Sequence, residues 1–142
     1  MSDPFDLARF VDAQRGVFER ACAELTAGAK RTHWMWFIFP QLAGLGTSPT
    51  ARHYAIRSLE EATAYRADPV LGPRLVAATR AALASGLHDA RALFGPPDDL
   101  KFASSLTLFE RTLPEEPLFS QALDRFFDGE RDTRTLALLG AA

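Results

Sequence analysis

The segment from His33 to Leu42 (HWMWFIFPQL) constrains the fold of this chain more than any other, because neither of its helical faces is plainly suited to water. It contains both tryptophans and one of the three histidines of the chain. At helical spacing its side chains fall on two faces, one made of His33, Trp36, Phe37 and Pro40 and the other of Trp34, Ile38 and Gln41. We therefore expect the segment to be enclosed on nearly all sides, with Trp34 and Trp36 both largely buried. Since an unpaired buried polar group costs about 1–3 kcal/mol, the polar side chains among them need partners in the protein or in a ligand.

The length and net charge of the chain are those of an ordinary globular domain. With 142 residues it fits a single domain, 1–142, that can bury a core of its own. The net charge of −2 comes from 16 basic and 18 acidic residues that are interspersed, which disfavours a nucleic acid duplex or an anionic membrane as partner. The start of the chain has no targeting pattern, and its longest uncharged run, 32–50, is interrupted by proline and glycine. We expect a cytoplasmic protein that lies on no membrane; its oligomeric state is not predicted.

Helical periodicity and capping signals cover most of the chain, whereas alternating strand patterns and hairpin turns are missing from the sequence. Serine or aspartate precedes several of the apolar periodic runs, as at Ser48, Ser58, Asp89, Asp98 and Asp132. The sequence predicts an all-α fold, a single irregular globular domain of about seven to nine short to medium helices. Besides the aromatic segment, the runs expected to be helical are about 4–15, 17–27, 49–56, 59–67, 69–85, 90–94, 98–113, 118–128 and 132–139.

Several of these residues carry a resemblance to a known family. They are the run Lys30–Gly46, then Ala55 and Ile56 with 60–62 and Tyr65, and finally 98–102 with 104–109. The chain resembles, over essentially its whole length, the bacterial family called domain of unknown function 1810, some members of which are labelled calpastatin-like. The resemblance implies a mostly helical single domain and no established reaction.

The aromatic segment is the first of three candidate constellations. His33 can exchange a proton near neutral pH, Trp34 and Trp36 can stack on a flat ligand, and Gln41 can donate and accept hydrogen bonds. The alternative is a central core helix whose polar tips bond backbone groups.

The second constellation is the loop from Gly44 to Arg52. Gly44, Gly46 and Ser48 offer backbone N–H groups and a hydroxyl just before a helix start, which favours an anion, and Lys30 can add positive charge. The alternative is a tight turn in which the glycines supply positive φ and Ser48 only caps the helix.

The third constellation is one helix edge with Lys101, Ser104 and Ser105, which lie within a turn of each other. Asp98 or Asp99 at the start of that helix could orient a ligand hydroxyl. The alternative is that the serines are small residues at a close helix contact. Because this edge and the His33–Gln41 segment both carry polar groups that their helices do not explain, we expect them to share one cavity.

Other chemistries have little support. Three histidines and one cysteine lack metal-ligand spacing, so we expect no metal and no cofactor. The paired carboxylates Glu60 and Glu61 are expected at the surface or in a helix cap.

These observations favour a pocket for a small phosphate-bearing planar molecule, such as a nucleotide or an ADP-ribose-like compound. If the protein is an enzyme, cleavage of an N-glycoside would need a carboxylate near the sugar, with Asp99 as first candidate and His33 as alternative acid or base. The alternative function is a non-enzymatic helical interaction module, in which the tryptophan-rich segment is only core or forms a partner groove. A concave site separates the two hypotheses.

Overall fold

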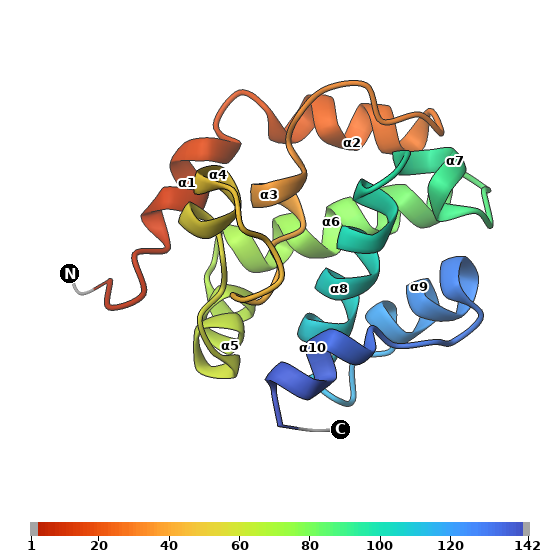
Figure 1. Cartoon of the computed structure of the whole chain (residues 1–142). Helices are drawn as coiled ribbons and strands as arrows, with labels where there is room; N and C mark the ends of the chain where they lie inside the picture. The colour runs from red at the N-terminus through yellow and green to blue at the C-terminus, as the bar shows by residue number, and fades with distance from the viewer. Residues whose placement is uncertain (1–2, 141–142) are drawn as a thin grey trace.

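Ten α-helices make up the regular secondary structure of the computed structural model, which describes residues 3–140 (Figure 1). In chain order they are α1 (Ala8–Gln14), α2 (Phe18–Thr26), α3 (Met35–Ile38), α4 (Pro49–His53), α5 (Leu59–Ala67), α6 (Leu71–Ala84), α7 (Ala90–Phe94), α8 (Asp98–Glu110), α9 (Leu118–Phe127) and α10 (Thr133–Leu138). No β-strand occurs among these described residues, so the predicted all-α class is confirmed. The ten helices exceed the predicted seven to nine by one.

Helix α8 is the central element of the fold. Its residues 102–109 are all buried, and it packs against α5, α7, α9 and α10 (Figure 1). Neighbouring elements therefore enclose the helix along these two turns. Asp98 is the first residue of α8 and not its cap, since Pro97 precedes it in the cap position.

Aromatic side chains from distant segments meet around α8. The Phe102 ring lies 4.9 Å from that of Phe39, 4.4 Å from that of Phe94 and 5.6 Å from that of Phe126, measured between centroids. Offset and edge-on arrangements at such distances stabilise aromatic pairs beyond the burial of area. On the other side of the core α2 packs along α6. The core therefore joins the aromatic segment, α7, α8 and α9.

The aromatic segment forms less helix than its spacing predicted. Only Met35–Ile38 is helical, in a single turn that begins after Trp34. Trp34 is fully buried, but Trp36 is only half-buried and His33 is exposed. The expectation that both tryptophans are buried is thus wrong for Trp36. A single turn has no continuous face, so the assignment of side chains to two helical faces does not hold.

The loop after the aromatic segment is fixed at both ends by backbone contacts. The Ala43 N–H donates to the Ile56 carbonyl (2.7 Å), and the Ile56 N–H donates to the Gln41 carbonyl (2.8 Å). At its other end Ser48 caps α4, accepting from the Ala51 N–H at 3.1 Å. The loop therefore presents its side chains from a defined backbone.

Two glycines of this loop have different reasons to be glycine. Gly44 has a φ of +101°, a conformation that disfavours other residues. Gly46 has no positive φ; instead, a Cβ there would lie 2.6 Å from the Ala51 Cβ. The prediction of positive φ is thus confirmed at Gly44 and wrong at Gly46, where close approach to α4 is the cause.

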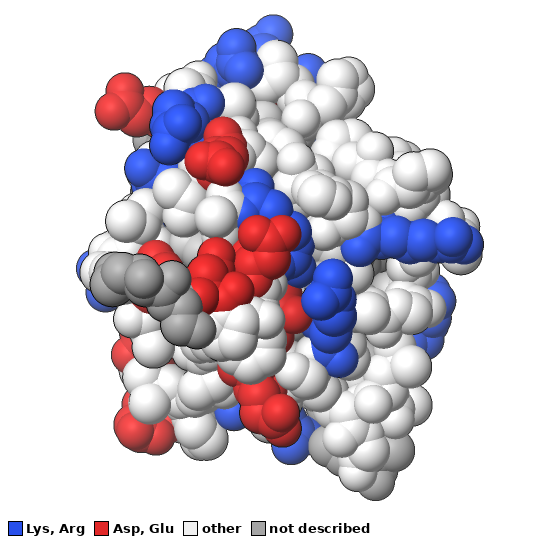
Figure 2. Space-filling model, turned by 90° about the vertical axis from the view of Figure 1, so that its left-hand side faces the viewer, with Lys and Arg blue, Asp and Glu red and all other residues white. Residues whose placement is uncertain are grey.

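Surface charge is mixed on the face drawn in Figure 2, where lysine and arginine lie beside aspartate and glutamate. Within residues 3–140 no helix is long and apolar enough to cross a membrane. The same residues hold no group of three or more histidine, cysteine, aspartate or glutamate side chains that could bind a metal ion.

Candidate functional site

A pocket of about 420 Å³ lies where the loop before α4, helix α8 and the start of α10 meet. We call it the α8/α10 pocket. Its volume is within the range of sites that bind small molecules. Its lining consists of Gln41, Leu45, Gly46, Thr47, Ser48 and Ala51 from the loop and α4, Pro97, Leu100, Lys101 and Ser104 from α8 and the residue before it, and Asp132 and Arg134 from the last helix and its cap.

Two cations lie at this pocket. The Lys101 ammonium is 3.5 Å from Asp98, but Asp98 is also paired with the buried Lys30 at 3.0 Å. The Asp98 carboxylate is therefore shared between two ammonium groups. Arg134 is exposed, and within residues 3–140 it forms no ion pair. The pocket thus has positive charge that the neighbouring acids do not fully balance.

The one acidic side chain in the lining is occupied by contacts within the protein. Asp132 caps α10, and its Oδ2 accepts from the Thr135 N–H (3.0 Å) and the Thr135 hydroxyl (2.6 Å). The same oxygen lies 3.2 Å from Ser104 Oγ, which is also 3.1 Å from the Leu100 carbonyl. Asp132 therefore joins α8 to α10 and fixes the far wall of the pocket.

Five of the predicted ligand-binding residues meet at this pocket. They are Gln41, Gly46, Ser48, Lys101 and Ser104. The second and third constellations thus lie together with one end of the aromatic segment. Sequence analysis did not select Asp132 and Arg134, whose only local signal was the helix start at the aspartate.

Other predicted site residues lie outside the pocket lining. His33 and Gly44 are exposed and line none of the cavities described, and Lys30 is held by Asp98 and by the Thr32 carbonyl (2.6 Å). Trp36 lines a small adjoining cavity of about 10 Å³ that shares Gln41 and Gly46 with the α8/α10 pocket. The Lys101 ammonium lies 5.3 Å from the centroid of the Trp36 ring. Lys101 therefore connects the indole of Trp36 with the pocket.

Two further predicted residues, Asp99 and Ser105, point into the protein. Asp99 Oδ1 and Ser105 Oγ are buried and have no hydrogen-bond partner among the described residues. Ser105 is only 1% exposed, so it does not share the edge that Lys101 and Ser104 present to the pocket. In this arrangement neither predicted catalytic residue, His33 nor Asp99, lines the pocket.

Trp34 owes its position to a buried carboxylate that the sequence did not reveal. Its indole N–H donates to Glu24 of α2 at 3.0 Å. The same carboxylate accepts from the backbone N–H of Arg31 (2.7 Å) and from the backbone N–H (3.0 Å) and hydroxyl (2.7 Å) of Thr32. Burial raises the pKa of Glu24, but these donors outweigh it and lower the pKa from 4.5 to about 2. Trp34 is therefore a core residue with a satisfied polar tip.

The chain matches a known protein family over nearly its whole length. A family described as a protein of unknown function, DUF1810, matches residues 4–139. The chain belongs to the DUF1810 family. The membership predicted from the sequence is thereby confirmed.

A solved structure supports the same fold for the family. The crystal structure of the conserved hypothetical protein Rv1873 from Mycobacterium tuberculosis is 50% identical and matches with a TM-score of 0.95, covering 99% of this chain and 100% of that chain. A search of curated proteins finds no significant match. Neither the family description nor the name of this relative specifies a reaction or a ligand.

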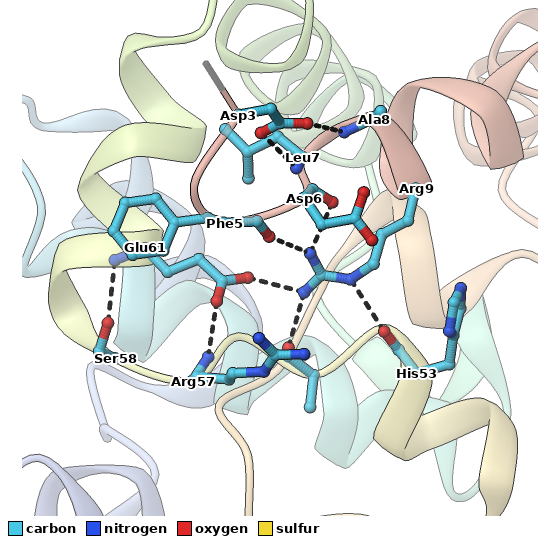
Figure 3. A network of polar contacts seen from close by, with 11 residues as sticks. Asp3, Phe5, Asp6, Leu7, Ala8, Arg9, His53, Arg57, Ser58 and Glu61 are labelled. Carbon is cyan, nitrogen blue, oxygen red and sulfur yellow. Dashed lines mark hydrogen bonds and ion pairs between the residues drawn. The ribbon is translucent and has the colours of Figure 1, made fainter.

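A second buried polar network in this family member joins α1 to α4 and α5 (Figure 3). The Arg9 guanidinium donates to Glu61 at 2.7 Å and also to four backbone carbonyls. Glu61 is fully buried, so the surface alternative is wrong for it, but the helix-cap alternative holds: its N–H donates to Ser58 at 3.1 Å, and its carboxylate accepts from the Arg57 N–H at 3.3 Å. A buried arginine with so many acceptors fixes the geometry of its surroundings. The network lies outside the α8/α10 pocket. It fixes the position of α4, the helix that borders the pocket.

Proposed function

We propose that the protein binds a small phosphate-bearing molecule, nucleotide- or ADP-ribose-like in size and charge, in the α8/α10 pocket. The observation that carries this proposal is the presence of Lys101 and Arg134 in one concave site with Gln41 and the Ser48 hydroxyl. Phosphate oxygens accept hydrogen bonds from ammonium, guanidinium, hydroxyl and amide donors, and all four types line the pocket.

The electrostatics of the pocket favour an anion over a cation. Asp132 is held by three donors, and Asp98 is shared between two lysines. The Lys101 ammonium lies 3.5 Å from Asp98, which is long for a salt bridge, so a ligand phosphate would compete well with Asp98 for this ammonium. Arg134 has no acidic partner among the described residues, so at Arg134 the phosphate would meet no competing carboxylate. Both cations are reached from solvent, so salt should weaken binding.

The planar part of the ligand rests on Trp36. A Lys101 side chain that turns toward a phosphate leaves the face of the indole over which its ammonium now lies. A nucleobase can then stack on that ring at the edge of the pocket, next to Gln41. We assign no reaction, since the predicted acid or base residues His33 and Asp99 do not line the pocket.

Calorimetric titration with AMP, ADP-ribose and NAD tests the proposal. Lys101→Gln and Arg134→Gln should each weaken binding by about tenfold or more, because a hydrogen bond to a charged group contributes about 1.5–3 kcal/mol. Arg20→Gln is the matched control, since Arg20 is an exposed residue of α2 that lines none of the cavities described. Gly46→Val is a poor probe, because its side chain would collide with Ala51 and disturb the loop itself.

Tryptophan fluorescence gives an independent readout. Trp34 is enclosed and bonded to Glu24, so a change of emission on ligand addition should come from Trp36 and should vanish in Trp36→Phe. Absence of heat with all three ligands at millimolar concentration would contradict the proposal. Binding that survives both charge substitutions unchanged would place the ligand elsewhere on the molecule.

A further inference from the structure

A second concave surface, formed by the end of α5, the turn after it and the outer side of α6, is separate from the α8/α10 pocket. It encloses about 710 Å³ and is open to solvent. Its floor is apolar and includes Pro73, Val76 and Ala77, and its charged lining residues are Arg66, Asp68 and Arg80. We call it the α5/α6 groove.

The charges of the groove are unbalanced in favour of the arginines. The Oδ1 atom of Asp68 accepts from the backbone N–H groups of Val70 (2.9 Å) and Leu71 (3.0 Å), which engages this carboxylate in the turn. Neither Arg66 nor Arg80 forms an ion pair with an acid within residues 3–140. Two guanidinium groups therefore face one carboxylate that already has partners.

The guanidinium of Arg66 is held in a fixed place at one side of the groove. The ring of Phe119 lies beneath it, with a centroid 5.6 Å from its Cζ atom. Its Nε is covered by the protein, and Arg66 as a whole is only half-buried. Arg66 therefore presents a positioned positive charge at the groove.

The second arginine lines the same groove as the first. Arg80 lies one turn beyond Val76 on α6, Arg66 lies at the end of α5, and both belong to the lining. The groove thus combines an aliphatic floor with two forked donors that match carboxylates.

We infer that the α5/α6 groove binds a segment of a partner protein in which acidic residues flank an aliphatic one. Carboxylates of that segment pair with Arg66 and Arg80, and the aliphatic side chain covers Val76. The openness of the groove favours a peptide over a free small molecule, because small-molecule sites bury most of the ligand surface. This inference uses none of the residues of the α8/α10 pocket and does not depend on the function proposed for it.

The experiment uses two labelled synthetic peptides, one of alternating glutamate and leucine and one of alternating lysine and leucine. Fluorescence anisotropy with the full chain should show binding of the acidic peptide only. Arg80→Gln should weaken it by about tenfold or more. Because Arg80 is exposed, this variant should fold. Arg66→Lys is a second variant, which keeps the charge but loses the planar fork that pairs with a carboxylate and should also weaken binding, and Arg20→Gln is the matched control.

Amide chemical shifts locate the contact. Peptide-induced shifts at Val76, Ala77 and Arg80 that inorganic phosphate does not reproduce would support the inference. No binding of the acidic peptide, equal binding of the basic peptide, or an affinity unchanged in Arg80→Gln would overturn it. Equal competition by inorganic phosphate would also overturn it, since the groove would then be a site for small anions.

Discussion

Glu24→Gln is the substitution that most directly tests how the core holds Trp34. Glu24 is 9% exposed, and its carboxylate accepts four hydrogen bonds, two from backbone N–H groups and one each from the side chains of Thr32 and Trp34. Glutamine keeps the shape but removes the charge, and its NH₂ group faces donors where the carboxylate had an acceptor. We expect the folded state to lose most of the stability that the charge provides.

The magnitude follows from the pKa of Glu24. A fall from 4.5 to about 2 on folding corresponds to about 3 kcal/mol of stability near neutral pH. Because the folded pKa lies below the unfolded one, this stability is complete above the unfolded pKa and is lost as the pH falls through the folded pKa. At pH 3.5 about a third to a half of it should be gone. The gap between wild type and Glu24→Gln should therefore narrow on acidification.

Urea unfolding followed by far-UV circular dichroism at neutral pH and at the acidic pH measures both quantities. Glu19→Gln is the matched control, since Glu19 is an exposed residue of the same helix and its change should stay within about 0.5 kcal/mol. A loss for Glu24→Gln no larger than that of the control would refute the reasoning. So would a loss that is the same at both pH values, because the effect would then not come from the charge.

Three further substitutions test other parts of the fold by chemical denaturation. Arg9→Met should cost about 3–5 kcal/mol, because it leaves Glu61 buried without its cation; adding Glu61→Gln should recover part of this, and no recovery would show that the ion pair is not the cause. Gly72→Ala should cost about 1–3 kcal/mol or more, because the added Cβ would lie 2.1 Å from a backbone carbonyl oxygen of α5. An unchanged denaturation midpoint would contradict this, since α5 and α6 would then move apart at no cost. Trp34→Ala should cost about 3–5 kcal/mol and Trp36→Ala clearly less, because only the first is fully buried; equal losses would contradict this difference.

Local chemistry in the sequence was sufficient for most helices and their starts. Ser48, Ser58, Asp89 and Asp132 each accept a hydrogen bond from a backbone N–H two or three residues ahead, as N-cap residues do. Such contacts involve only neighbours along the chain, so the residue pattern specifies them. The same holds for the all-α class, which follows from apolar spacing and from the lack of strand patterns.

The candidate site was only partly predictable for the same reason. Gly46, Ser48, Lys101 and Ser104 stood out because their polarity or their glycine character was unexplained by the local helix. Arg134 gave no such signal, since an exposed arginine on a short helix is ordinary. Its place in the pocket depends on how α10 packs against α8, and the sequence alone does not give that.

By itself, the sequence determined the helical class, most helix starts and the segments from which a pocket could be built. Only the tertiary structure decided which polar groups are buried and with whom. Both Trp34 and Trp36 were expected to be buried, yet only Trp34 is, with its indole N–H donating to Glu24, while the Lys101 ammonium lies over the half-buried Trp36. The physical reason is that burial of a polar side chain depends on a partner brought close by folding, and nothing in the local pattern encodes the position of that partner.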